Sequence, residues 1–212
     1  LFRPLWDATD GAQGYVSFEV SPRLAHDTEG TIDAAARLWK TINRPNVMIK
    51  IPATPAGCMA ISEVIGRGLN VNVTLIFSQD QLHAVQAAHQ AGLRRWAAHC
   101  QQMGTPERIS DVASVASFFV SRTDNTVDPK LPAELQGKTA IALCKTAYEQ
   151  WQGDLTESMA DLIALGAKPQ WLLWASTSVK NPAYPDTLYV DALIGAQTVN
   201  TLPDATLAAF CD

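Results

Sequence analysis

Short apolar runs alternate along the chain with longer segments in which apolar residues recur every three or four positions. Six of the short runs are predicted β-strands, at residues 15–20, 47–52, 71–77, 112–120, 171–175 and 198–202. The helical spacing predicts helices at about residues 29–43, 55–66, 138–152 and 155–165, a long one after Ser78 and one starting near Pro203. Strands and helices in this succession predict right-handed crossovers and a parallel sheet.

Local signals support the helix boundaries in the middle of the chain. Pro55 stands where the first turn of a helix accepts proline, and Gly66 and Gly68 mark the end of the same helix. Ser78 is placed to cap the long helix that follows. These signals predict helix-strand-helix units with short connections.

The most informative polar residue is Lys50, which interrupts the apolar run Val47–Pro52. A run this hydrophobic predicts a buried parallel strand. Burial removes water from an ammonium group and favours the free amine, which is the nucleophile of an enzyme that attacks ketones through a Schiff base. The alternatives are a lysine that reaches back to water from an edge strand and a lysine paired with a carboxylate.

Other strands also carry polar residues, and their spacing suggests one common face. Asn72 and Thr74 lie two apart in one strand, and Glu19 follows Ser17 by two in another. Residues two apart share a face of a strand, so these side chains and Lys50 can all point to one axis. An open sheet covered on both faces by helices has no use for them, whereas a barrel gathers catalytic side chains at its C-terminal mouth. The absence of GxGxxG and P-loop motifs also argues against a nucleotide-binding open sheet.

The composition limits which classes of binding partner and which cellular compartment we expect. The chain has 212 residues, a net charge of −5 and 47% hydrophobic residues, which indicates one globular domain and argues against nucleic-acid or anionic-membrane partners. No apolar run is long enough to span a membrane. The four cysteines are far apart and the four histidines show no metal-ligand spacing, so we expect reduced thiols, no metal, no other cofactor and a cytoplasmic location.

Several segments together resemble the transaldolase family, whose members are class I Schiff-base enzymes with a (β/α)8 barrel. The matching segments follow the family's order and are residues 16–20, 48–54, 70–78, 117–122 and 174–182. The lysine strand and the strand Asn72-Val73-Thr74-Leu75-Ile76-Phe77 are specific when found together. Residues 23–29 resemble a bacterial subgroup in which the domain can be fused to a glucose-6-phosphate isomerase domain.

The resemblance implies three catalytic residues. By similarity, Lys50 is the Schiff-base nucleophile, Glu19 positions the water used in carbinolamine dehydration, and Thr74 shares that water. A carboxylate near a lysine is able to orient water and move protons. The alternatives are a structural Glu19–Lys50 ion pair and an ordinary strand threonine.

The resemblance also implies a substrate site. Asn72 looks like the amide near the lysine, and Ser117 and Phe119 match positions that line the site, although Phe119 also suits barrel filling. Arg122 resembles a phosphate-binding arginine, since a guanidinium clamps phosphate with two hydrogen bonds. Ser176 and Lys180 resemble the rest of that pocket, with lysine where many relatives have arginine; for Lys180 the alternative is a surface salt bridge.

The chain departs from the family pattern in its strand count. Six strands are predicted, whereas a barrel of this type has eight, and by resemblance the first two βα units are absent. The first of these brings an aspartate that acts in carbon–carbon cleavage, which Asp7 and Asp10 do not match. We therefore expect a single α/β domain over residues 1–212, of TIM-barrel type, that is a fragment of a longer chain and is alone poorly stable, self-associating or inactive.

The resulting functional hypothesis is a transaldolase. The resemblance implies transfer of a dihydroxyacetone unit from sedoheptulose 7-phosphate or fructose 6-phosphate to an aldose phosphate, in the pentose phosphate pathway. Two alternatives remain: a Schiff-base aldolase of the same barrel family, and a non-catalytic remnant that binds sugar phosphates or packs against a partner domain. The expected partners are sugar phosphates, with a homo-oligomer or a fused isomerase domain as further options.

Overall fold

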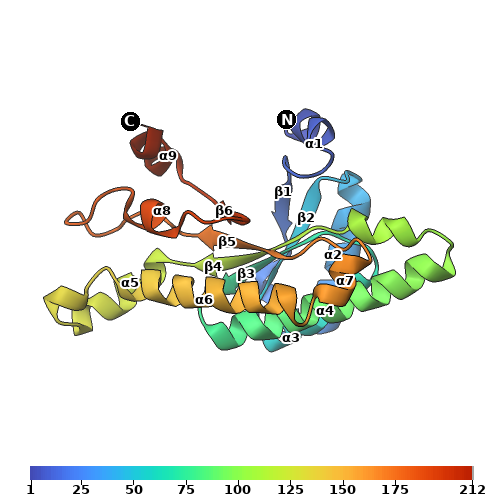
Figure 1. Cartoon of the computed structure of the whole chain (residues 1–212), viewed down its shortest axis with the longest axis horizontal. Coiled ribbons are helices and arrows are strands. Elements are labelled where there is room, and N and C mark those ends of the chain that lie inside the picture. The colour runs from blue at the N-terminus through green and yellow to red at the C-terminus, as the bar shows by residue number, and fades with distance from the viewer. Residues whose placement is uncertain (212) are drawn as a thin grey trace.

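Six parallel strands form one sheet in which each strand pairs with its neighbours in chain order (Figure 1). The computed structural model describes residues 1–211. The strands are β1 (Val16–Glu19), β2 (Val47–Pro52), β3 (Val71–Ile76), β4 (Ser114–Phe119), β5 (Trp171–Ala175) and β6 (Thr198–Asn200). The prediction of six parallel strands in an α/β fold of TIM-barrel type is confirmed.

Helices connect the strands and flank the sheet. The α-helices are α1 (Arg3–Ala8), α2 (Thr28–Ile42), α3 (Pro55–Gly66), α4 (Gln79–Gln102), α5 (Ser121–Val127), α6 (Thr139–Thr156), α7 (Ala160–Ala164), α8 (Leu188–Leu193) and α9 (Asp204–Cys211). Short 3-10 helices lie at Pro22–Leu24, Pro106–Asp111, Asp128–Lys130 and Ala133–Leu135. None of the helices within residues 1–211 is long and apolar enough to cross a membrane.

The predicted helix boundaries in the middle of the chain are confirmed. The Thr54 hydroxyl caps α3 by accepting the Gly57 N–H at 2.9 Å, and the Ser78 hydroxyl caps α4 by accepting the Gln81 N–H at 3.2 Å. Gly68 follows α3 with φ of +81°, a left-handed conformation that glycine adopts without strain. These caps set where the chain turns back into β3 and out of it.

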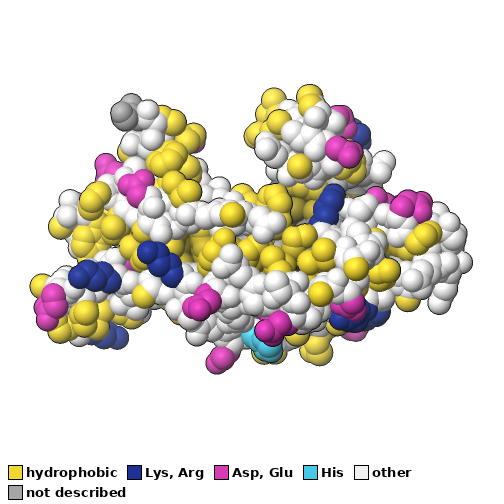
Figure 2. Space-filling model, in the orientation of Figure 1, with side chains coloured by type: hydrophobic (Ala, Val, Ile, Leu, Met, Phe, Trp, Pro, Cys, Tyr) yellow, Lys and Arg dark blue, Asp and Glu magenta, His cyan; other side chains and the backbone are white. Residues whose placement is uncertain are grey.

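The two faces of the sheet have different surroundings. One face packs on α2, α3, α4 and α6 and forms the main hydrophobic core. The other face is concave and carries a smaller apolar cluster of Met48, Ala113, Val115, Phe119, Leu173 and Ala175. Figure 1 shows α1 and α9 standing at opposite sides of this second face, and Figure 2 shows hydrophobic side chains between them.

Within the described residues the sheet does not close, because β1 pairs only with β2 and β6 only with β5, which agrees with the expectation of six strands where a full barrel has eight. The structure adds three helices, α1, α5 and α8, that are absent from the sequence-based prediction. Each has six or seven residues, fewer than two turns, so each shows too little apolar periodicity to be recognised.

Candidate active site

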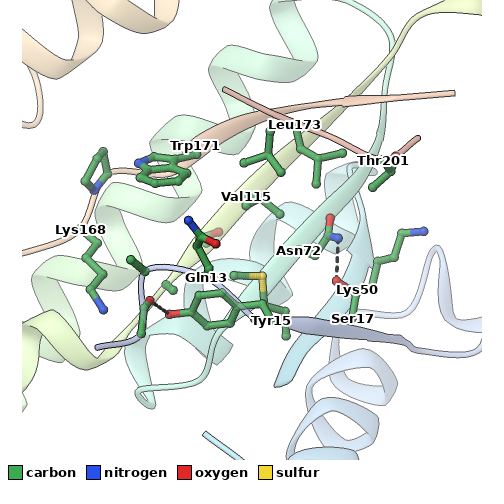
Figure 3. A pocket seen from close by; sticks show the side chains of 18 of the residues that line it. Gln13, Tyr15, Ser17, Lys50, Asn72, Val115, Lys168, Trp171, Leu173 and Thr201 are labelled. Carbon is green, nitrogen blue, oxygen red and sulfur yellow. Dashed lines mark hydrogen bonds between the residues drawn. The ribbon is translucent and has the colours of Figure 1, made fainter. Parts of the chain in front are cut away.

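The concave face of the sheet carries a cavity of about 910 Å³. Its walls come from every strand and from the loop before β1, and Figure 3 shows Lys50 and Lys168 at opposite ends of it. Three of the predicted site residues, Glu19, Lys50 and Asn72, line the cavity. A cavity of this size with a few polar groups is typical of a ligand site.

The centre of the predicted site is an ion pair between neighbouring strands. The strand register sets Glu19 beside Lys50, and the Lys50 Nζ lies 3.4 Å from the Glu19 Oε2. β2 itself is buried, as predicted, but the Lys50 side chain keeps 29% exposure and that of Glu19 keeps 50%. The expected full burial of the amine is therefore wrong, because the concave face next to Lys50 opens to solvent.

Asn72 connects three strands through its side-chain amide. The register of β2 and β3 sets Asn72 beside Lys50. The Asn72 Nδ2 donates to the Ser17 hydroxyl at 2.8 Å, and the Ser117 hydroxyl donates to the Asn72 Oδ1 at 2.7 Å. These two bonds hold the amide plane against the lysine strand, and Ser17 is a partner that the sequence analysis did not single out for this role.

Thr74 lies two residues after Asn72 on β3, opposite Pro52. Its side chain is 1% exposed, and its hydroxyl has no hydrogen-bond partner within the described part of the chain. The β3–β4 register shifts between Val73 and Ile76, and Leu75 has φ of +61°. Bulges of this kind re-aim side chains near active sites, and a buried hydroxyl without a partner offers a hydrogen bond to water or substrate.

The residues predicted to bind phosphate follow the carboxyl ends of β4 and β5. Arg122 is exposed, and its guanidinium carbon lies 4.8 Å from the centre of the Phe119 ring. The Ser176 hydroxyl contacts the Ser121 hydroxyl at 3.1 Å, and Ser176 has φ of +58°. Lys180 is exposed in the segment after β5 and forms none of the ion pairs found within residues 1–211.

The structure thus brings predicted site residues together in two groups, and only the first group has members that line the cavity. One group contains Glu19, Lys50, Asn72 and Ser117, joined by the contacts above. The other contains Phe119 and Arg122, with Ser176 attached to the start of α5 through Ser121. Thr74 lies on the lysine side by its strand register. Among residues 1–211, Lys180 forms no ion pair with a member of either group.

The cavity also has a wall that sequence reasoning missed. Tyr15, Lys168 and Trp171 line it at the amino ends of β1 and β5. The Tyr15 hydroxyl donates to the Gly11 carbonyl at 2.8 Å, and burial raises the pKa of this phenol. A signal was present for Tyr15, since Tyr15, Ser17 and Glu19 alternate and therefore share a face.

The described residues offer no cluster of three or more His, Cys, Asp or Glu side chains that could hold a metal ion. Of the four histidines, only His89 is buried, on the helix side of the sheet. The four cysteines are free thiols.

Comparison with known proteins identifies relatives of the whole chain. The profile of the transaldolase/fructose-6-phosphate aldolase family matches residues 2–212. A transaldolase from Neisseria gonorrhoeae is 50% identical over 207 residues, which cover 97% of this chain and 57% of the relative. A transaldolase from Parafrankia sp. is 50% identical over 221 residues, with 100% of this chain and 58% of the relative covered.

A third relative, a transaldolase from Thiobacillus denitrificans, is 46% identical over 220 residues, which cover 100% of this chain and 60% of the relative. The chain therefore spans less than two thirds of the length of the curated relatives that it matches. Similarity along the entire chain agrees with the resemblance seen in the separate sequence motifs.

Proposed function

Because the chain belongs to the transaldolase/fructose-6-phosphate aldolase family, we propose that it carries the Schiff-base centre of a transaldolase. In this proposal Lys50 is the nucleophile, and the donor is a ketose phosphate such as fructose 6-phosphate or sedoheptulose 7-phosphate. The acceptor is an aldose phosphate. The reaction moves a three-carbon dihydroxyacetone unit from one sugar to the other.

The chemistry starts with the free amine of Lys50. The amine attacks the ketone carbon, a carbinolamine forms, and loss of water leaves an iminium ion. The bond between the first and the second carbon beyond the iminium carbon then breaks, and its electrons move to the iminium to form an enamine. The hydroxyl on the second carbon loses its proton to a base and becomes the aldehyde of the aldose phosphate that leaves. The enamine that stays on Lys50 attacks the aldehyde of the acceptor, and water releases the new ketose and the free lysine.

Glu19 and Thr74 are the proposed acid–base partners. Glu19 lies 3.4 Å from the amine, close enough to accept a proton from it or to orient a water beside it. The buried Thr74 hydroxyl has no hydrogen-bond partner within residues 1–211, so it is proposed to bind the water that leaves the carbinolamine. Asn72 is fixed by Ser17 and Ser117 next to Lys50 and is proposed to bind a substrate hydroxyl.

The phosphate of the sugar is proposed to bind at Arg122, Ser176 and Lys180. Two of these residues carry positive charge, and all three follow the carboxyl ends of β4 and β5, which is where barrel enzymes bind substrate. Phe119 packs under the Arg122 guanidinium, which supports a defined orientation of the guanidinium plane and its N–H donors.

The single observation that carries the proposal is the Lys50–Glu19 pair facing the cavity. Reduction with borohydride in the presence of fructose 6-phosphate tests it, since reduction makes the imine permanent. Wild type should gain one stable adduct, located at Lys50 by peptide mass spectrometry, and Lys50→Ala should gain none.

Lys168→Ala is the matched control, because Lys168 lines the same cavity at the far end. This variant should keep the adduct. An adduct on Lys168, or the absence of any adduct in wild type, overturns the proposal.

Product analysis separates transfer from simple cleavage. With an aldose phosphate acceptor, a transaldolase forms a new ketose phosphate, whereas an aldolase releases dihydroxyacetone with or without the acceptor. Binding of sugar phosphate without an imine would instead indicate a non-catalytic domain. A cytoplasmic location and a homo-oligomer or fused isomerase domain remain predictions that accompany this proposal.

A further inference from the structure

Three polar residues lie on one face of helix α5 and its continuation. Ser121, Asp124 and Asp128 are spaced by three and four positions, which places them on the same side of a helix. Asp124 is 1% exposed and Asp128 is 8% exposed. Arg122, one residue after Ser121, is exposed on a different side.

Each of these three residues contacts the segment that follows β5. Ser121 contributes two contacts, because its N–H donates to the Ser176 carbonyl at 3.0 Å and its hydroxyl contacts that of Ser176 at 3.1 Å. The Tyr189 hydroxyl donates to the Asp124 Oδ2 at 2.9 Å, and the Tyr184 hydroxyl donates to the Asp128 Oδ2 at 2.7 Å. The segment from Ser176 to Tyr189 is therefore attached to α5 at three points.

Both carboxylates also hold the start of α6. The Asp124 Oδ1 accepts the Ala140 N–H at 2.7 Å, and Asp128 accepts the Gly137 N–H at 3.1 and 3.2 Å. A Cβ on Gly137 would lie 3.0 Å from the Tyr184 ring, so the tyrosine packs directly on this glycine. These contacts leave α5 little freedom to rotate or slide.

The carboxylates have this role without a cationic partner. None of the ion pairs within residues 1–211 includes Asp124 or Asp128. Burial raises the pKa of Asp124, while the Ala140 N–H and the Tyr189 hydroxyl oppose this shift, and burial together with Asp124 raises the pKa of Tyr189. Burying an acid among neutral donors costs stability, and the fixed geometry of α5 against its neighbours is what these contacts supply in return.

We propose that Asp124, Asp128, Tyr184 and Tyr189 are positioning residues that hold Arg122 in register with Ser176 and Lys180 for binding a phosphate group. Arg122 belongs to the anchored helix, and Ser176 and Lys180 belong to the anchored segment. The Ser121–Ser176 contacts fix the two groups at one end, and the carboxylate–tyrosine contacts fix them further along both segments, since the three proposed phosphate-site residues make no direct hydrogen bond to one another within residues 1–211. The inference rests on the proposed phosphate site.

The test removes the hydroxyl of Tyr184 and keeps the aromatic ring. Tyr184→Phe loses the bond to Asp128, and Tyr148→Phe is the matched control, because Tyr148 is also half-buried and its hydroxyl donates to the Ala196 carbonyl at 3.1 Å. Inorganic phosphate is titrated against the purified chain and its dissociation constant measured by phosphorus NMR line broadening. Melting temperatures are recorded for every variant.

Tyr184→Phe should weaken phosphate binding about fivefold, which corresponds to one hydrogen bond, and Tyr148→Phe should leave it unchanged. Arg122→Ala should abolish the binding. In borohydride trapping, Tyr184→Phe should also lower the preference for fructose 6-phosphate over unphosphorylated dihydroxyacetone by about the same factor.

The outcomes separate this inference from the proposed reaction. Equal phosphate affinity in Tyr184→Phe and wild type overturns the inference. An equal fall of the affinity in Tyr184→Phe and Tyr148→Phe also overturns it. So does phosphate binding that is absent or that does not depend on Arg122. Arg122-dependent phosphate binding that falls in Tyr184→Phe supports the inference even if no imine is trapped, and in that case only the proposed reaction fails.

Discussion

Asn72 donates a 2.8 Å hydrogen bond to Ser17, although the two residues lie on strands that are not neighbours. β2 separates their strands, and adjacent strands lie about 4.8 Å apart, so the two backbones are about 10 Å apart across the sheet. Short side chains bridge such a distance only where a strongly curved sheet makes its inward side chains converge. This bond indicates barrel-like curvature from β1 to β3.

This bridge leads to a prediction for Ser117, which completes the network on β4. Ser117→Ala should lower the free energy of unfolding by about 1 kcal/mol, because the buried Asn72 Oδ1 loses its donor. Urea denaturation followed by tryptophan fluorescence measures the change. Ser110→Ala, which removes an exposed hydroxyl bonded to the Glu107 carbonyl, should cost less; equal losses would contradict the argument.

A second prediction concerns the carboxylate beside the amine. Glu19→Gln should slow the formation of the trapped adduct by about 100-fold, because the amide cannot take up a proton during carbinolamine formation. Glu63→Gln is the control, since Glu63 pairs with Arg67 and Arg95 away from the cavity. Single-turnover trapping measures both rates, and an unchanged rate in Glu19→Gln would remove Glu19 from the proposed mechanism.

A third prediction concerns stability at low pH. Burial lowers the pKa of His89 from 6.5 to about 4, so below about pH 6.5 the unfolded chain binds a proton that the folded chain does not. The free energy of unfolding should therefore fall as the pH falls from about 6.5 to about 4, by about 3 kcal/mol in total from this group.

Urea denaturation at several pH values checks this dependence. His89→Gln should flatten it, whereas His83→Gln, an exposed position on the same helix, should not. Asp154 is another ionisable residue that lines the small cavity containing His89. A pH dependence that is identical in wild type and His89→Gln would show that another group titrates in this range.

A fourth prediction compares two glycines with left-handed backbone. Gly68→Ala should lower the free energy of unfolding by about 3 kcal/mol, because alanine is strained at φ of +81° and its Cβ would lie 2.6 Å from the Trp96 ring. Gly104→Ala shares the strain, at φ of +71°, but has nothing within 4 Å. Gly104→Ala should lower the free energy of unfolding by about 1 kcal/mol. Thermal unfolding of both variants gives the difference, and equal costs would rule out the clash with Trp96.

A fifth prediction addresses the unpaired edge at β1. Phe18 is 52% exposed on this edge strand, and exposed apolar edges favour pairing with another copy. Phe18→Lys should reduce self-association, as sedimentation velocity over a concentration series would show. Met59→Lys, at an exposed position on helix α3, should have a smaller effect. A monomeric wild type at all concentrations would contradict this prediction.

The strands and long helices were predictable because their signals are local. The apolar run of β2, the capping residues Thr54 and Ser78 and the glycine after α3 each act within a few residues of the element they define. That Glu19 and Lys50 share a face also followed, because residues two apart in a strand lie on the same face and consecutive parallel strands pair.

The remaining features depend on contacts between distant parts of the chain. The exposure of Lys50 depends on how much of the concave face is covered, and the Asn72–Ser17 bond depends on the curvature of the sheet. The contact of Tyr184 with Asp128 joins residues 56 positions apart, with no repeating pattern in the sequence to indicate it. For the same reason the contacts between tyrosines and carboxylates behind the residues proposed to bind phosphate became visible only in three dimensions.

The strand order has a consequence for how the protein assembles. Every strand pairs with the one before it in the chain, so no hydrogen-bonded ladder has to wait for a segment synthesised much later. During translation β2 can pair with β1 as soon as Pro52 has emerged, whereas Ser176 and Lys180 emerge more than a hundred residues afterwards. Lys50 can thus lie beside Glu19 before the segment that carries Ser176 and Lys180 has been synthesised.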